Sequence, residues 1–133
     1  MAKLTKHEKK NFAALGDEVR LHVAVGVVAQ LYDVGDRTLL LKWQARVSAP
    51  VQDARDALAH LLNRIGFSYS QLARRFDRTE RAMMYAVSRS RKAIDGCDDE
   101  RLCFLQAVDD VVAVLRVSTA SPGSHLINQE VAA

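Results

Sequence analysis

The fold is set by residues 66–94, whose sequence is GFSYSQLARRFDRTERAMMYAVSRSRKAI. Within it, Ser68–Gln71 has the pattern of a capping box, which predicts a short helix that ends at Phe76. A second start signal, Asp77–Glu80, predicts a longer helix to about Ile94. Two start signals so close together predict a short helix, a tight turn and a longer helix. That is the layout of a helix-turn-helix.

This segment is also strongly basic. In the window from Arg64 to Lys92, only two acidic residues, Asp77 and Glu80, lie among the cationic side chains, which are Arg64, Arg74, Arg75, Arg78, Arg81, Arg89, Arg91 and Lys92. The whole chain has a formal net charge of only +3, so the rest of the chain is net acidic. Cationic charge concentrated on one such motif indicates a protein that neutralises phosphates. A solvated helical surface is the alternative explanation.

Composition predicts an all-α protein with a single core. The chain has 133 residues, 49% of them hydrophobic, and its six glycines and two prolines are few for a β protein. Residues 22–31 are the main apolar run, and they are too few to span a bilayer, which needs about 20. We therefore expect a helical bundle in the cytoplasm, associated with the nucleoid.

The N-terminal third, residues 1–47, is expected to form helices that pack on or extend the bundle. Thr5–Glu8 predicts a capped helix to about Leu15, and Asp17 is expected to cap a helix over 17–33. The apolar stripe of that second helix is predicted to comprise Val19, Val23, Val27 or Val28, and Leu31. Residues 38–47 favour a helix, with a strand as the alternative, and Trp43 is expected to anchor the core.

The remaining chain divides into a core over 48–96, a helix over 97–117 and a flexible tail over 118–133. Pro50 favours a helix start, and Gly66 a helix stop. The helix between them is predicted to bury Ala54, Ala57, Leu58, Leu61, Leu62 and Ile65. The last helix is predicted to bury Leu102, Leu105, Val108, Val112 and Leu115. Two reduced thiols, Cys97 and Cys103, are assigned to that helix.

The segment from Ala54 to about Ile94 resembles the C-terminal DNA-binding domain of the bacterial replication initiator DnaA, a Trp-repressor-like helical fold. The resemblance rests on Ala54–Leu61, on Gly66–Arg74 with Phe76, and on Met84–Val87. It covers about a third of the chain. It implies that Arg55 enters the minor groove of DNA, that the Ser68 hydroxyl contacts the backbone, and that 78–82 begin a recognition helix.

Two departures from that family narrow the implied function. The run Arg78-Thr-Glu-Arg-Ala82 keeps the arginine but not the Asp-His-Thr-Thr pattern, which predicts a different DNA site. The chain also has no phosphate-binding G-x-x-x-x-G-K-[ST] loop, so no nucleotide and no ATP-driven cycle are expected.

A helix that begins near Thr79 would turn Met83, Ala86, Val87 and Ile94 inward. Its outer face would carry Glu80, Arg81, Met84, Tyr85, Ser88 and Arg89. Arg81 could pair with guanine, Glu80 with cytosine and Ala82 with a thymine methyl, although Glu80 could instead be only a capping residue. The predicted DNA contacts are Arg55, Ser68, Arg74, Arg78, Thr79, Glu80, Arg81, Ala82, Tyr85 and Arg89. Among them, Arg74 and Arg89 suit phosphates, as do Arg91 and Lys92.

Several other residues have simpler expected roles. Met83 and Met84 are expected to fill the core, and Tyr69 and Tyr85 to pack, with stacking on a base as the alternative. The four histidines are scattered, and no spacing indicates a metal site, a cofactor or catalysis. We therefore expect no enzyme activity and no cofactor.

These features predict a sequence-specific, double-stranded DNA-binding transcription regulator of bacterial or phage-like type, such as the activator of a gene-transfer-agent cluster. A replication accessory protein without ATPase activity is one alternative, and an adaptor that binds an acidic protein is another. The additional helices could contact the transcription machinery or pair two copies as a homodimer. Sequence leaves open the operator, the oligomeric state and the choice between activation and repression.

Overall fold

The computed structural model describes residues 4–43 and 47–120, and these form seven helices and no strand. The helices are α1 (Lys6–Ala13), α2 (Asp17–Tyr32), α3 (Asp36–Leu40), α4 (Ala49–Arg64), α5 (Tyr69–Phe76), α6 (Glu80–Gly96) and α7 (Asp98–Ala120). The chain is thus an all-α helical bundle, as its composition predicted. No helix in the described ranges has the length and apolar character needed to cross a membrane.

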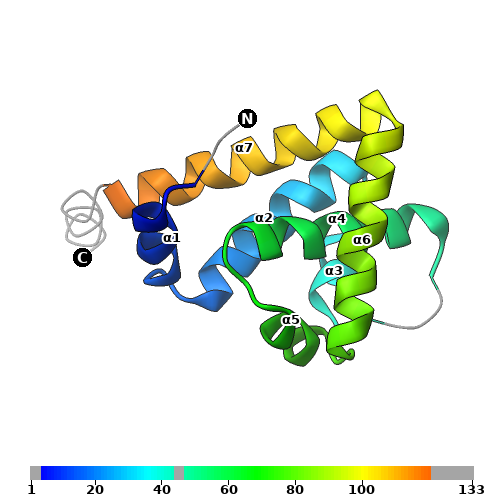
Figure 1. The fold of residues 1–133 in the computed structure, drawn as a ribbon, viewed down its shortest axis with the longest axis horizontal. Helices are drawn as coiled ribbons and strands as arrows, with labels where there is room; N and C mark the ends of the chain where they lie inside the picture. Colours follow the sequence, from blue (N-terminus) through cyan, green and yellow to red (C-terminus); the bar gives the residue numbers. More distant parts are fainter. Residues whose placement is uncertain (1–3, 44–46, 121–133) are drawn as a thin grey trace.

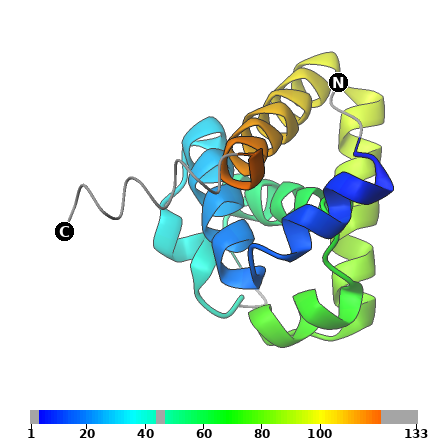
Figure 2. The same ribbon diagram turned by 90° about the vertical axis from the view of Figure 1, so that its left-hand side faces the viewer.

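Helix α4 lies at the centre of the bundle and packs against α2, α3, α5, α6 and α7. Figures 1 and 2 show α7 along one side of the bundle, α6 running away from the start of α7, and α5 next to the far end of α6. All nine residues 54–62 of α4 are buried. The predicted core positions Ala54, Ala57, Leu58, Leu61, Leu62 and Ile65 are all confirmed.

Local signals correctly located several helix ends. The capping boxes at Thr5 with Glu8 and at Ser68 with Gln71 are both present. Gly66 follows α4 with φ +120°, a conformation that L side chains rarely adopt, so it is suited to the helix stop predicted there. These predictions depend only on neighbouring residues, which explains why they could be made from the sequence.

The start of α6 differs from the prediction. Asp77 does not cap α6 but ends α5 in the left-handed conformation, with φ 57°. Thr79 caps α6 instead, and its hydroxyl accepts a hydrogen bond from the backbone N–H of Ala82 at 3.0 Å. Both residue types suit either position, and the short connection leaves Asp77 to turn the chain and Thr79 to begin the helix. Glu80 is consequently the first residue of α6 and not part of a capping box.

Helix α2 bears out its predicted stripe only in part, since Val28 is buried but both ends of the stripe are exposed. Its buried residues are Arg20, Leu21, Ala24, Val25, Val28 and Ala29, whereas Val19 and Leu31 are exposed and Val23 and Val27 are half-buried. Apolar residues of this valine-rich helix lie on several of its faces, so periodicity alone could not identify the face that packs against the core. Gly16, not Asp17, is the residue that precedes the first helical position.

The segment after α2 is helical over only five residues. Helix α3 ends at Leu40, so the prediction of a helix through residue 47 is wrong; residues 44–46 lie outside the described ranges. Trp43 is buried, as expected, but from a loop. Its indole stacks on Phe76 with ring centroids 4.0 Å apart, and its Nε1–H donates to the Leu39 carbonyl. Trp43 is thus buried by contacts with α5 and α3 and not by a place on a helix face.

Helix α7 extends beyond the prediction, because Ser118–Ala120 are helical rather than part of a tail; residues 121–133 lie outside the described ranges. Val108, Val112 and Leu115 are buried as predicted and Leu105 is half-buried, but Leu102 is exposed and Phe104 is buried in its place. Both thiols are free, Cys97 exposed and Cys103 half-buried. Cys97 follows α6 and precedes α7, so the pair does not share one helix.

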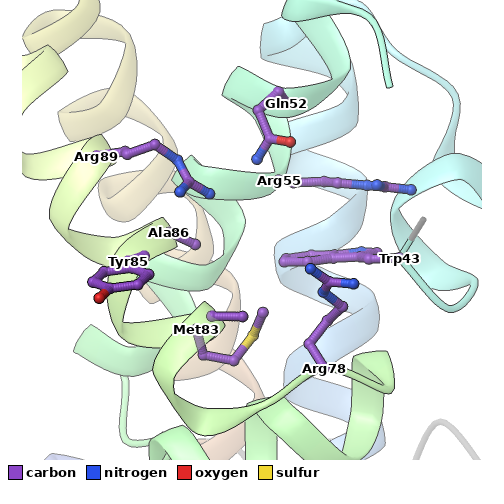
Figure 3. Close-up of a pocket in the computed structure, with 9 residues that line it drawn as sticks. Trp43, Gln52, Arg55, Arg78, Met83, Tyr85, Ala86 and Arg89 are labelled. Carbon is purple, nitrogen blue, oxygen red and sulfur yellow. The ribbon is translucent and has the colours of Figure 1, made fainter. Parts of the chain in front are cut away.

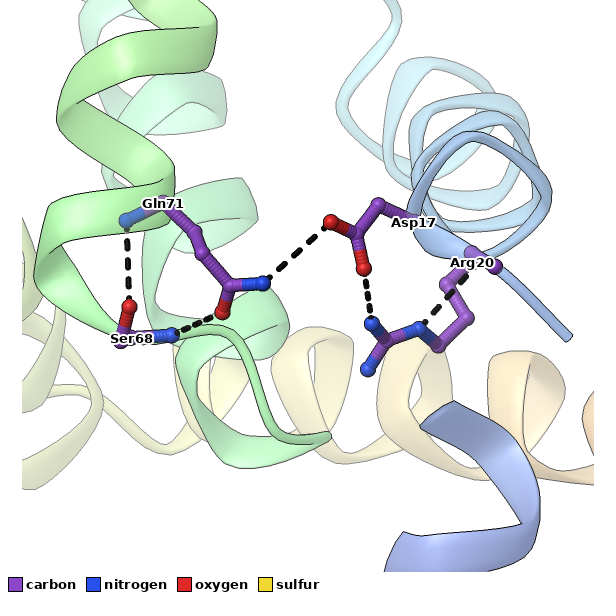
Figure 4. A network of polar contacts seen from close by, with 5 residues as sticks. Asp17, Arg20, Ser68 and Gln71 are labelled. Carbon is purple, nitrogen blue, oxygen red and sulfur yellow. Dashed lines mark hydrogen bonds and ion pairs between the residues drawn. The ribbon is translucent and has the colours of Figure 1, made fainter. Parts of the chain in front are cut away.

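A polar network fastens the start of α2 to the start of α5 (Figure 4). The carboxylate of Asp17 accepts from the Arg20 guanidinium and, at 3.3 Å, from the side-chain amide of Gln71. The same Gln71 side chain accepts from the Ser68 backbone N–H in the capping box. Arg20 is buried and lies 4.5 Å from the centre of the Phe67 ring. The N-terminal helices therefore form part of the bundle and hold α5 in place.

Candidate nucleic-acid interface

Helix α6 presents a polar face to solvent along its first three turns. Glu80, Arg81, Met84, Tyr85, Ser88 and Arg89 are exposed, whereas Met83, Ala86 and Val87 are buried and Ile94 is half-buried. This division matches the predicted one. Two expectations of packing are wrong, because Met84 and Tyr85 are 52% and 56% exposed; Met83 is a core residue and Tyr69 packs against the core. Tyr85 is therefore available for an external contact.

A groove of about 390 Å³ runs beside this face, between α4 and α6, and we call it the α4–α6 groove. It is lined by Trp43, Gln52, Arg55, Arg78, Ala82, Met83, Tyr85, Ala86 and Arg89. In Figure 3, the Arg55 side chain lies above the Trp43 ring and the Arg78 guanidinium below it, with Arg89 on the α6 side. Three arginines and no carboxylate line the groove within the described part of the chain.

Arg55 belongs to the wall of this groove. Its side chain is buried, and its guanidinium carbon lies 5.5 Å from the centre of the Trp43 ring. Burial lowers the pKa of Arg55, and the nearby positive charge of Arg78 lowers it further. Burial and the charge of Arg78 both disfavour the charged form of Arg55, so an anion bound in the groove would stabilise that form.

Arg89 is held by a carboxylate. The Asp56 side chain, 8% exposed, accepts from Nε of Arg89 at 2.9 Å and from Nη2 at 3.0 Å. Gln52 donates to the same carboxylate at 2.8 Å. These hydrogen bonds raise the pKa of Arg89 and offset much of its positive charge. Asp56 itself lines a neighbouring cavity of about 450 Å³, which also includes Tyr32 and Ile94.

Behind the α4–α6 groove, His60 joins α4 to α6 and α7. Its Nδ1 lies 2.9 Å from the Ser90 hydroxyl, and its ring stacks on Phe104 with centroids 4.3 Å apart. Burial, together with the positive charges of Arg91 and Arg64, lowers the pKa of His60 to about 4. The imidazole is therefore neutral near pH 7, where it can hold α6 without burying a charge.

Arg74 lines a different groove, also of about 390 Å³, between α2 and α5; we call it the α2–α5 groove. Asp17 and Glu18 from α2 line the same surface, together with Arg75. Arg75 donates to the Leu40 carbonyl at 2.9 Å and lies 3.8 Å from a carboxylate oxygen of Glu18. Acidic residues of α2 thus balance the basic residues of α5 at this surface.

Ser68 is the N-cap of α5, as the sequence predicted. Thr79 is the N-cap of α6, for which the sequence had placed the start signal at Asp77–Glu80. Each hydroxyl oxygen accepts a backbone hydrogen bond of its own helix, from Gln71 at 3.1 Å and from Ala82 at 3.0 Å. Each hydroxyl proton can still be donated to an external acceptor. Both residues are exposed.

The structure thus brings together only part of the predicted contact set. Arg55, Arg78, Ala82, Tyr85 and Arg89 line one groove, and Thr79, Glu80 and Arg81 adjoin it on the turn and first turn of α6. Ser68 and Arg74 lie at α5, away from that groove. Sequence reasoning missed Trp43 and Gln52 as lining residues and Asp56 as the partner of Arg89. Asp56 and Arg89 are 33 residues apart, and no local pattern could pair them.

The remaining cations of the basic segment differ in how far their charge is offset. Arg64 has a nearby negative charge in Asp109, which opposes the lowering of its pKa by burial. Within the described residues, no ion pair forms at Arg74, Arg78, Arg81, Arg91 or Lys92. Arg78 and Arg81, one on each side of Thr79, therefore place uncompensated charge at the start of α6.

No group of three or more histidine, cysteine, aspartate or glutamate residues is placed to hold a metal ion within residues 4–43 and 47–120. No protein-family model, no curated protein and no solved structure matches the chain. The resemblance to the initiator domain therefore stays a prediction from the sequence.

Proposed function

We propose that this chain binds double-stranded DNA with α5, the following turn and α6, and that it regulates transcription. The observation that carries the proposal is the start of α6. There Arg78 and Arg81 are exposed without carboxylate partners among the described residues, beside a groove lined by further arginines. Uncompensated guanidinium groups at an exposed helix N-terminus suit both phosphates and base edges. The all-α architecture is compatible with the initiator-like helix-turn-helix predicted from the sequence.

In the proposed complex, the first turns of α6 enter the major groove, which is wide enough for a helix. Arg81 would donate to guanine and Glu80 would accept from cytosine, because both side chains are exposed at the helix start. Ala82 is half-buried in the α4–α6 groove and would touch a thymine methyl only if the base edge approached closely. Ser68 and Thr79 would donate hydroxyl protons to phosphates.

The test is retention of fragmented genomic DNA by the full chain over a range of salt concentrations. We expect the logarithm of the affinity to fall steeply with the logarithm of the salt concentration, with a slope that reflects on the order of 4 to 7 phosphate contacts. Sequencing of the retained fragments should give a common site, and a reporter fused to that site should change its output when the protein is expressed. A flat salt response would sink the proposal.

The retention and reporter experiments test DNA binding and transcriptional regulation separately. A retained site whose reporter does not respond, but which lies at a replication origin, would favour a replication accessory role. If binding depends steeply on salt but the retained fragments share no common site, the protein binds DNA without sequence specificity. Binding of an acidic protein in preference to DNA would favour an adaptor.

A further inference from the structure

Helix α1 carries a second group of positive charges, in a part of the chain remote from α6. Lys6, Lys9 and Lys10 are exposed, and none of them forms an ion pair within the described residues. The only carboxylate of the helix belongs to Glu8, and it accepts from Nε of Arg116 at 2.6 Å and from Nη2 at 3.2 Å. The charge of Glu8 is therefore compensated by α7, and the lysines keep theirs.

The three lysines lie on one face of α1. Lys6 precedes Lys9 and Lys10 by three and four positions, a spacing that brings side chains together on the surface of a helix. Glu8 and Phe12 occupy the opposite face, where Glu8 contacts α7 and Phe12 is 1% exposed. Like charges at the spacing of the lysines repel each other and destabilise the helix. An anionic partner along this face would replace that repulsion with attraction.

Helix α1 is part of the folded bundle, so its lysines are presented from a defined position. Phe12 belongs to the core, Leu4 and Leu15 pack against it, and the capping box at Thr5 fixes the first turn. The next helix, α2, is fastened at its start to α5 by the network of Figure 4. In Figure 2, α1 lies above α5. The lysines are thus carried by the end of the bundle that is joined to the start of α5.

We propose that Lys6, Lys9 and Lys10 form a second contact with the DNA backbone, outside the site read by α6. The inference rests on the proposed function and names a further surface for the same partner. Exposed lysines bind phosphates as point charges, so this contact adds affinity and no sequence preference.

A long polyanion suits this arrangement because the two basic surfaces are separate. In Figure 1, the start of α2 and α5 lie between α1 and the start of α6. These two elements line the α2–α5 groove, where Asp17 and Glu18 balance Arg74 and Arg75. A duplex carries a negative charge for about every 1.7 Å of its axis, so it supplies phosphates to both basic surfaces while passing the balanced one.

The experiment compares two duplexes cut from one retained genomic fragment. One spans about one and a half helical turns and the other about three, so that only the second extends well beyond α6. The affinity of the full chain for each duplex is measured by fluorescence anisotropy over a range of salt concentrations. The longer duplex should bind more tightly, with a salt slope steeper by about two to three phosphate contacts.

Two triple variants test whether the lysines are responsible. Lys6→Gln, Lys9→Gln and Lys10→Gln together should remove the advantage of the longer duplex, a loss of about tenfold in affinity, and leave binding of the shorter duplex nearly unchanged. The matched control replaces the same three lysines with arginine, which keeps the charge and should keep the advantage. Only exposed side chains change, and thermal unfolding followed by circular dichroism checks that each variant is folded.

The outcomes separate this contact from the proposed function. Equal binding of both duplexes by the native chain, or an equal loss for both in the glutamine variant, overturns the second contact while DNA binding stands. Polyglutamate is the third probe. If the glutamine variant loses polyglutamate binding but keeps the advantage of the longer duplex, α1 binds an acidic protein and the inference is wrong. A native chain that binds neither duplex overturns the proposed function itself.

Discussion

The α4–α6 groove and the α2–α5 groove differ in charge although both contain arginines. The first is lined by Arg55, Arg78 and Arg89; Asp56 holds Arg89, whereas Arg78 forms no ion pair within the described residues. The second contains Arg74 and Arg75 together with the acidic residues Asp17 and Glu18. An arginine is thus an indicator of phosphate binding only when the surrounding elements leave its charge uncompensated.

The largest expected effect on DNA binding comes from comparing an arginine at the start of α6 with an arginine of the α2–α5 groove. Arg81→Ala, at the start of α6, should weaken DNA binding by about 1 to 3 kcal/mol and relax the preference for the bound site, because it removes the proposed base contact. Arg74→Ala, in the α2–α5 groove, should weaken binding by less than about 1 kcal/mol, because acidic neighbours already screen it. Mobility-shift titrations of both variants on one duplex measure the difference. Equal losses would show that the two surfaces do not differ in function.

A second prediction concerns the support behind the α4–α6 groove. The pKa of His60 is about 4 in the folded chain, below its ordinary value of 6.5, so the unfolded chain binds a proton more readily between these values. The free energy of unfolding is therefore unaffected by His60 above about pH 6.5 and decreases as the pH falls from there toward 4. We expect a loss of roughly 2 kcal/mol, after allowance for partial solvent screening.

Urea unfolding at several pH values between 7 and 4 measures that loss. The His60→Gln variant is the control, because it keeps a polar side chain that can bond to Ser90 but does not titrate. Its stability should change less over the same range. If the variant and the native chain lose stability in parallel, His60 is not the group responsible.

The smallest expected effect comes from removing the carboxylate that holds Arg89, which tests whether compensation of its charge limits DNA binding. Asp56→Asn keeps the size of the side chain and leaves Arg89 with an uncompensated charge. Nonspecific DNA affinity should rise by about two- to fivefold, and the salt slope should steepen by no more than about one contact. A thermal unfolding curve must accompany the measurement, since Asp56 also accepts from Gln52. Unchanged affinity in a folded variant would mean that Arg89 does not face the DNA.

The sequence predicted best what depends on short-range chemistry. The capping boxes at Thr5 and Ser68, the stop at Gly66 and the inward face of α4 all follow from residues a few positions apart. Predictions failed where several local choices were equally good. Asp77 and Thr79 are both suitable caps, and the valines of α2 left its buried face undetermined.

The candidate site was predicted in part for the same reason. The outward face of α6 follows from helical periodicity once the helix start is known to within a residue or two. The pairing of Arg89 with Asp56, the contact between Arg55 and Trp43, and the acidic surroundings of Arg74 do not follow from periodicity. They join residues of different helices or of a helix and a loop.

By itself, the sequence determined that this protein is helical, where most of its helices lie, and that its basic residues gather on α5 and α6. Those properties arise from caps, periodicity and composition, which act along the chain. Only the tertiary structure decided which arginines retain an uncompensated charge. That depends on packing, because charges interact through space and their partners here lie as far as 33 and 57 residues away along the chain.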